Sequence, residues 1–390
     1  MKRYTLLFLS LLFLACGTKE DLNSTAYYNV LDISKKGNKE QIIGLQIDTI
    51  YIDSAVETSF IGDFWIANES VYFSDTYFNY IHQFSRNGDV IGKYVGKGNG
   101  PNEALGFHYT IPTSNDFKLL FGGNSSIYSF NKNWKKTSGY RINWDIQMSI
   151  PEILKNPDPS ITGAYEFDYG IPEIFKTWDE NHLAIAITAS HPKFNGYFNT
   201  PLYYNHSRIL ALVNIETGKI DRLIGRRSPF YLSKENLPNF DHFNYEVASK
   251  EAFVNFWVDP FVYILDKKTG LATSKFGFPG RDMKANYPIT KTYEMAGERV
   301  VDDMVNFGYY NYLKYSHNTK LLFRGYTKGE ETNTDGLQIY KEYALIGDID
   351  VPKGFKIIGA IGKEFFGSIQ NKNTDEGRLK FLKIKFSYEN

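Results

Sequence analysis

Short apolar strands alternate with polar turns along most of the chain. One unit begins with Val71–Asp75, continues with Tyr80–Ser85, turns at Asn87-Gly88 and ends with Val90–Val95. An Asn-Gly pair between alternating strands is a strong hairpin signal, because asparagine and glycine tolerate the backbone angles of the tight turn. The pattern therefore predicts strands joined by a hairpin over residues 71 to 95.

Similar units recur downstream. Their paired strands are predicted at Leu119–Phe121 and Ser126–Phe130, Leu183–Ile187 and Ile209–Val213, Phe253–Trp257 and Phe261–Leu265, Leu321–Phe323 and Leu337–Ile346, and Phe365–Ile369 and Leu379–Phe386. Six units spaced about 40 to 70 residues apart indicate a repeat array such as a β-propeller. One sheet alone leaves both faces in water, so neighbouring sheets must stack on it. Most of the aromatic residues are then expected to fill the space between sheets.

The segment Gln41–Ile50 is strand-like but has no partner within a unit of its own. We expect it to pair with Leu379–Tyr388, because joining the two ends of the array removes the free sheet edges. The predicted fold is therefore all-β: a single six-bladed β-propeller domain over residues 41–390, closed by an N-terminal strand that joins the last blade.

One stretch carries a family resemblance. Val71–Phe84, followed by Asn87-Gly88 and Gly96–Glu103, resembles a blade of the NHL-repeat and TolB-like six-bladed β-propellers. It is especially similar to the largely uncharacterised propeller lipoproteins typical of gut-type Gram-negative bacteria. The resemblance covers residues 60 to 108 and implies a fold and a cell-envelope setting. The family offers no catalytic residues to carry over.

The N-terminus reads as an export signal. Lys2 and Arg3 precede the apolar run Leu6–Leu14, and Ala15-Cys16 follows. A charged start, an apolar middle and a small residue at the exit are typical of a secretory signal. The run is about nine residues long, whereas a membrane-spanning helix needs roughly 20. A cysteine after a small residue at this position resembles the lipobox of bacterial lipoproteins, although Phe13 and Leu14 depart from its usual residues.

The lipobox resemblance implies a division of the N-terminal region. Residues 1–15 would be the lipoprotein signal peptide, Cys16 the lipid attachment site carrying acyl chains such as palmitate, and residues 16–40 a polar tether. More than one acyl chain makes such an anchor stable. Lys19-Glu20-Asp21 resembles a triplet that directs some lipoproteins to the outer cell surface. We therefore expect a lipid-anchored protein of the outer membrane and leave its surface or periplasmic face open. A membrane span and an ordinary buried thiol at Cys16 are the alternatives.

Charge and composition narrow the partners. Lysine plus arginine equals aspartate plus glutamate at 44 each, so the chain lacks the basic excess of nucleic-acid-binding proteins. Aromatic residues make up 16% of the chain, which suits pleated, half-buried strands. The expected partners are the membrane, through the anchor, and a glycan, a peptide or an envelope protein.

Motifs for catalysis are missing from the sequence. The seven histidines show no compact metal-ligand spacing, and no Gly-x-Ser-x-Gly elbow is present. The glycine-rich stretch Gly96–Pro101 lacks the Gly-Lys-Ser/Thr ending and the helix of a phosphate-binding loop. We therefore predict no cofactor, no metal and no catalytic residues.

A long insertion offers tentative ligand-binding residues. The segment Ser190–Ser207 contains Tyr197, Tyr203, Tyr204 and His206, which combine flat rings with hydrogen-bonding groups suited to sugars or peptides. Function often lies on loops that a rigid scaffold carries. The alternative is that these side chains pack the loop onto the sheets. The preferred function is a binding module; the second hypothesis is a metal-assisted lactonase or a glycan hydrolase or lyase on the same propeller, since fold alone does not decide function.

Overall fold

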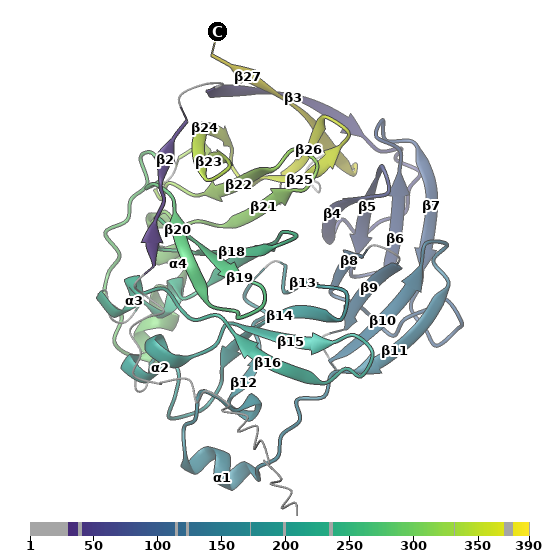
Figure 1. The fold of residues 1–390 in the computed structure, drawn as a ribbon. Helices are drawn as coiled ribbons and strands as arrows, with labels where there is room; N and C mark the ends of the chain where they lie inside the picture. The colour runs from purple at the N-terminus through teal and green to yellow at the C-terminus, as the bar shows by residue number, and fades with distance from the viewer. Residues whose placement is uncertain are drawn as a thin grey trace, which may run out of the picture.

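Antiparallel sheets surround a common centre in a propeller-like arrangement, so the fold is all-β as predicted (Figure 1). The structure is a computed structural model that describes residues 30–37, 41–113, 116–121, 125–171, 173–197, 200–233, 237–330, 332–369 and 377–389. The predicted signal peptide, Cys16 and the Lys19-Glu20-Asp21 triplet lie outside the described residues. Across the described part of the chain, no helix is long and apolar enough to cross a membrane.

Three sheets form the first half of the arrangement. The first sheet contains β4 (Gly62–Ala67), β5 (Ser70–Asp75), β6 (Tyr80–Phe84) and β7 (Val90–Val95). The second contains β8 (Tyr109–Pro112), β9 (Asp116–Phe121), β10 (Ser126–Asn131) and β11 (Lys136–Arg141). The third contains β12 (Tyr165–Phe167), β13 (Phe175–Thr177), β14 (His182–Ala189), β15 (Leu210–Asn214) and β16 (Ile220–Ile224).

Two larger sheets complete it. The fourth sheet contains β17 (Phe243–Val247), β18 (Glu251–Phe256), β19 (Val262–Asp266) and β20 (Ala272–Phe276), with β1 (Leu31–Asp32) added in parallel to β20. The fifth has two antiparallel runs. One is β21 (Tyr312–Ser316), β22 (Leu321–Tyr326), β23 (Thr334–Lys341) and β24 (Ala344–Pro352). The other is β25 (Phe355–Ile361), β26 (Glu364–Ile369), β27 (Lys380–Tyr388) and β3 (Ile42–Tyr51). One bridge, Gly347 to Ile42, links the two runs, and β2 (Lys35–Lys36) pairs in parallel with β24.

The two ends of the chain pair as expected. Strand β3 runs antiparallel to β27 from the pair Tyr51–Lys380 to the pair Ile42–Tyr388, which confirms the predicted pairing of the early segment with the C-terminal strand (Figure 1). Residues 31–36, which the sequence assigns to the tether, instead add β1 and β2 to the outer strands of the fourth and fifth sheets. Two-residue strands carry too little pattern to be recognised in the sequence.

Helices occupy the connections. They are α1 (Ile150–Lys155), η3 (Thr162–Ala164), α2 (Thr200–His206), α3 (Phe230–Ser233), η4 (Pro238–Phe240) and α4 (Tyr293–Asn306). Three of the four α-helices lie between consecutive sheets, and α2 lies between the middle strands β14 and β15. In an antiparallel four-strand run, the second connection and the link to the next run lie at the same end of the strands. The α-helices therefore gather on one face of the propeller, and short hairpins form the other.

Matching side-chain hydrogen bonds build two Thr-Gly turns, Thr217-Gly218 and Thr269-Gly270. The Asn214 side-chain oxygen accepts the backbone N–H groups of Glu216 and Thr217 at 3.0 Å each. In the next sheet, Asp266 accepts the corresponding N–H groups of Lys268 and Thr269 at 3.1 and 2.8 Å. Both turns end in a glycine with positive φ, 72° at Gly218 and 71° at Gly270, which other residues adopt only with strain.

Aromatic side chains fill the space between sheets, as expected. Trp65 and Tyr72 of the first sheet stack at 4.3 Å between ring centroids, and Phe117 of the second sheet stacks at 4.2 Å on Trp134. Trp65 meets Phe117 edge-on at 5.6 Å across the interface. Apolar burial of this kind stabilises stacking by roughly 25 cal/mol per Å² removed from water.

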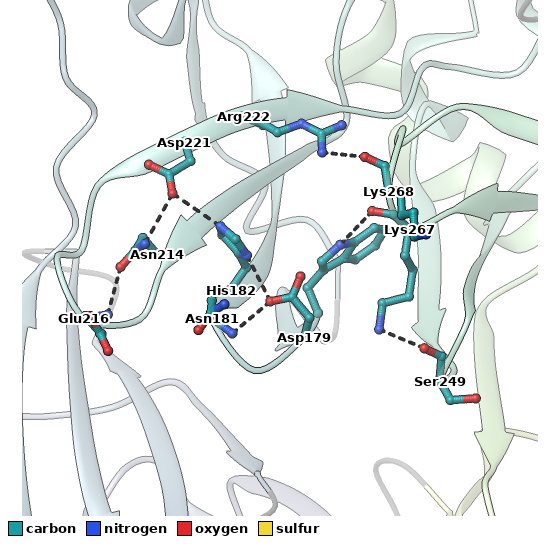
Figure 2. Close-up of polar contacts among 11 residues, drawn as sticks. Asp179, Asn181, His182, Asn214, Glu216, Asp221, Arg222, Ser249, Lys267 and Lys268 are labelled. Atoms are coloured by element: carbon teal, nitrogen blue, oxygen red, sulfur yellow. Dashed lines mark hydrogen bonds and ion pairs between the residues drawn. The ribbon is translucent and has the colours of Figure 1, made fainter.

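Polar contacts join the third and fourth sheets at the rim (Figure 2). His182 lies between two carboxylates, with Nδ1 2.9 Å from Asp179 Oδ1 and Nε2 3.3 Å from Asp221 Oδ2. Arg222 donates to the carbonyl oxygens of Lys268 and Thr269, both at 2.7 Å. The two Arg222 hydrogen bonds fix the Thr-Gly turn of the fourth sheet against the outer strand of the third sheet.

Candidate ligand-binding channel

A cavity of about 640 Å³ lies at the centre of the propeller. It is lined by β4, β8, β13, β17, β21 and β25, the first strand of each four-strand run, which neighbour one another around the centre. A cavity of this volume is in the usual range for small-ligand sites, which are concave and hold a few convergent polar groups. We call it the central channel.

Charged side chains converge in the central channel. The inner strands and their adjoining residues contribute Asp63, Glu69, Glu173, Lys176, Glu246, Lys314 and Lys356. These side chains come from four of the five sheets. The ring topology brings them together, because each run starts at the centre.

Four of these groups form an ion-pair network. Lys176 Nζ lies 2.9 Å from Glu246 Oε1 and also contacts the Glu173 carboxylate. Lys314 Nζ lies farther away, 3.7 Å from Glu173 Oε2 and 3.8 Å from Glu246 Oε1. Lys176 and Glu246 are buried, whereas the Glu173 side chain is 54% exposed toward the channel. The network contains two cations and two anions.

The network holds its members in their charged forms. Desolvation alone would raise the pKa of Glu173, but Lys176 and Lys314 lower that pKa below its usual range. Desolvation alone would likewise lower the pKa of Lys176, but Glu173 and Glu246 raise it. Each charge therefore compensates the cost of bringing its partners out of bulk water.

Asp63 and Lys356 occupy neighbouring inner strands, β4 and β25, and stand outside this network. Among the described residues, neither side chain has a hydrogen bond or ion pair within 4 Å. The Asp63 side chain is exposed to the channel but lies deep within the ring of sheets. Desolvation by the surrounding sheets raises the pKa of its carboxyl group, while nearby Lys356 lowers that pKa. The channel thus presents an acid and a base that influence each other electrostatically but make no close hydrogen bond or ion pair among the described residues.

The tentative residues of the long insertion lie away from the central channel. Tyr203 and Tyr204 are 2% and 1% exposed. Tyr203 donates to Asp241 Oδ2 at 2.6 Å, and Tyr204 stacks on Tyr231 at 5.1 Å between centroids. Their burial favours the alternative in which they pack the insertion onto the sheets, because almost no surface is left for a ligand.

Tyr197 and His206 remain partly accessible. The Tyr197 ring meets Tyr293 of α4 edge-on at 5.4 Å, and desolvation raises its pKa. His206 ends α2 and is half-buried, which lowers the pKa of its imidazole. Ligand binding by these two residues stays a prediction.

The glycine-rich stretch after β7 closes on itself. The Gly100 N–H donates to Glu103 Oε2 at 2.8 Å, and the Ala104 N–H donates to the Gly96 carbonyl at 3.0 Å. Because these groups are satisfied within the loop, they form a structural turn and not an open cradle for phosphate.

Within the described ranges, no group of three or more His, Cys, Asp or Glu side chains is placed to hold a metal ion. His108 and His317 border the central channel without such companions. The described residues therefore supply no ligand set for the metal-assisted hypothesis.

Sequence reasoning missed the channel residues. Their signal was present, since a lysine or a carboxylate interrupts an otherwise apolar or aromatic strand in Phe175–Thr177, Phe243–Val247 and Tyr312–Ser316. A charge in the innermost strand must face either another charge or a water-filled space. Recognising this requires knowing which strand of each unit is innermost.

Comparisons with known proteins agree with the fold. No family model matches the chain, and no curated protein matches it significantly. A crystal structure of a DUF4221 family member from Bacteroides vulgatus is similar with a TM-score of 0.66 and 14% identity, covering 90% of this chain and 100% of that one. A crystal structure of a Bacteroides fragilis protein that is described as a predicted exported protein is similar with a TM-score of 0.55 and 10% identity, covering 92% of this chain and 99% of that one. At such low identity, these likenesses show that the chain has the propeller-like β fold and nothing narrower.

Proposed function

We propose that this protein is a lipid-anchored binding module of the cell envelope, and that its ligand enters the central channel. The preferred ligand classes are a glycan, a peptide or a segment of an envelope protein. The observation that carries the proposal is the convergence of seven charged side chains in one cavity of about 640 Å³. Buried charges are costly, so a network of them around an open space favours a site for a polar ligand.

The proposal includes six blades. The fifth sheet would count as two blades, with β3 as the outer strand of the last. Turn packing supports this count. Gly218 lies against Tyr140 and Arg141 of β11, and Gly270 lies against Ile224 of β16. Gly88, in the equivalent turn of the first sheet, lies against Ile50 and Tyr51 of β3. Strand β3 thus receives the neighbouring turn as the outer strands of two other sheets do.

Anchoring through Cys16 is part of the same proposal. Its support is the sequence of residues 1–16 together with the exported designation of the Bacteroides fragilis neighbour. Full-length protein with Cys16 should fractionate with membranes and incorporate labelled palmitate. The Cys16→Ala variant should lose the label and leave the membrane fraction. Unlabelled wild-type protein would argue against the anchor without touching the channel hypothesis.

Binding can be tested with the detergent-solubilised full-length protein. A panel of oligosaccharides, short peptides and envelope proteins would be screened by calorimetry, and hits would be repeated with Lys314→Ala, which removes a channel cation that is only loosely paired. The matched control is Lys132→Ala, an exposed lysine in the turn after β10. Weaker binding in the channel variant alone supports the proposal. Ligands that bind the Lys314→Ala variant as tightly as the wild type, or a panel without any binding, count against the proposal.

The second function, a metal-assisted lactonase or a glycan hydrolase or lyase, is kept as the alternative. Elemental analysis of the purified protein separates the two. A stoichiometric divalent ion whose retention depends on Glu173 or Glu246, two of the carboxylates that line the channel, would favour the enzyme. Turnover of a lactone or glycan that stops in the same variants would establish it.

A further inference from the structure

We propose that the ligand of the central channel is a zwitterion, such as an amino acid or a short peptide with free termini, whose carboxylate meets Lys356 and whose ammonium meets Asp63. This inference rests on the proposed function and narrows its ligand class. It is carried by the placement of Lys356 and Asp63, neither of which has a hydrogen bond or ion pair within 4 Å among the described residues, on neighbouring strands of the same cavity.

The charge balance of the channel leads to this ligand. Lys176 and Lys314 are matched by Glu173 and Glu246, so the ion-pair network is neutral by itself. Asp63 and Lys356 lie on neighbouring inner strands, one of each sign, and among the described residues neither has a hydrogen bond or ion pair within 4 Å. Glu69, in the turn after β4, adds a further exposed carboxylate to the lining. A purely anionic ligand would pair Lys356 and leave Asp63 without a close partner. A zwitterion gives both Lys356 and Asp63 a close partner.

The network can assist both ends of such a ligand. Lys314 stands 3.7 and 3.8 Å from its carboxylates, beyond hydrogen-bond distance, so its ammonium can turn toward a ligand carboxylate at little cost. Glu173 is half exposed to the channel and can accept a hydrogen bond from a ligand ammonium.

The walls set the size and the remaining contacts. Tyr109, Ile111 and Ile358 add ring and aliphatic surface from β8 and β25. The cavity of about 640 Å³ has room for a ligand with a side chain as well as two charged ends. Neutral side chains of the ligand would lie against these walls.

The test compares matched probes on the full-length protein. Free amino acids and alanyl dipeptides are titrated calorimetrically beside their N-acetylated and C-amidated forms, which lack one charge each. We expect at least one zwitterionic probe to bind, and each blocked form to bind about tenfold or more weakly. Asp63→Asn should weaken the zwitterion while leaving the N-acetylated form unchanged. Lys356→Gln should weaken the zwitterion while leaving the C-amidated form unchanged.

The controls separate the possible failures. Lys132→Gln should bind like the wild type, and thermal melting of each variant reports whether it folds. If both channel variants misfold, the comparison of free and blocked probes on the wild type still tests whether the ligand must be a zwitterion. Blocked forms that bind as well as zwitterions overturn the inference. A neutral oligosaccharide that binds and is displaced by no zwitterion also overturns it but leaves the channel as the site. A panel without channel-dependent binding overturns both proposals.

Discussion

Arg324 of β22 provides the most direct test of how the sheets are held together. Its side chain is fully buried and reaches from the fifth sheet into the fourth. Nε donates to Asn255 Oδ1 at 2.6 Å, Nη1 to the Pro260 carbonyl at 2.7 Å and Nη2 to the Asp259 carbonyl at 2.5 Å. The guanidinium also lies 3.3 Å from the Tyr310 ring centroid. Replacing it with alanine removes these bonds and leaves buried acceptors without donors.

The magnitude follows from the hydrogen bonds. A bond to a charged group contributes about 1.5–3 kcal/mol, and such contributions do not add fully. For Arg324→Ala we expect a loss of about 4–6 kcal/mol in the free energy of unfolding. With an unfolding entropy of about 2.1 cal/mol/K per residue over roughly 350 residues, the midpoint would fall by about 5–8 °C.

Arg222→Ala is the matched control. Arg222 also donates twice to carbonyls of a neighbouring sheet, at 2.7 Å each, but those contacts are exposed (Figure 2). Water replaces exposed hydrogen bonds, so we expect a loss of less than about 1 kcal/mol. Thermal melting by circular dichroism compares the two variants. Arg324→Lys, which keeps the charge, serves if the alanine variant does not fold. Equal shifts for both arginines would refute the argument that burial decides the strength of these contacts.

Three further predictions concern closure, acidity and turns. Deleting residues 380–390 removes β27, the partner of β3, and should lower the melting midpoint of the whole domain in one transition; an unchanged midpoint would contradict ring closure. Desolvation lowers the pKa of buried His82, so the unfolded chain, in which histidine titrates at about pH 6.5, takes up a proton here more readily than the folded protein does. Stability should therefore fall on acidification from pH 7 to 5, and less steeply in His82→Gln, as urea unfolding would show; identical slopes would exclude His82 as a cause. Gly270→Ala places a Cβ 2.6 Å from Ile224 Cγ2 at a positive φ and should cost about 1–3 kcal/mol, whereas Gly44→Ala, with open space around it, should cost under about 0.5 kcal/mol; similar melting midpoints for the two variants would disprove the turn argument.

The helix α4 was not expected from the sequence, although a local signal marks its start at Tyr293. Thr292 caps it, since its side-chain oxygen accepts the Met295 N–H at 3.2 Å. Only Ala296 and Asp303 of this helix are buried, so no continuous apolar face marked it in the sequence.

The sequence by itself determined the two middle strands of each run, the hairpins and the meeting of the two chain ends. The strands and hairpins depend on local alternation and on turn residues such as Asn214, Asp266 and their glycines, which act within a few positions. The meeting of the two ends follows because their pairing removes free sheet edges. Only the tertiary structure decided which side chains share the central channel and which tyrosines of the insertion are buried. Lys176, Glu246 and Lys314 meet because inner strands of separate sheets converge. Tyr203 is buried because the fold packs it against Asp241, which is distant in the sequence. Such long-range contacts depend on how sheets stack around a centre, and no pattern of neighbouring residues records that.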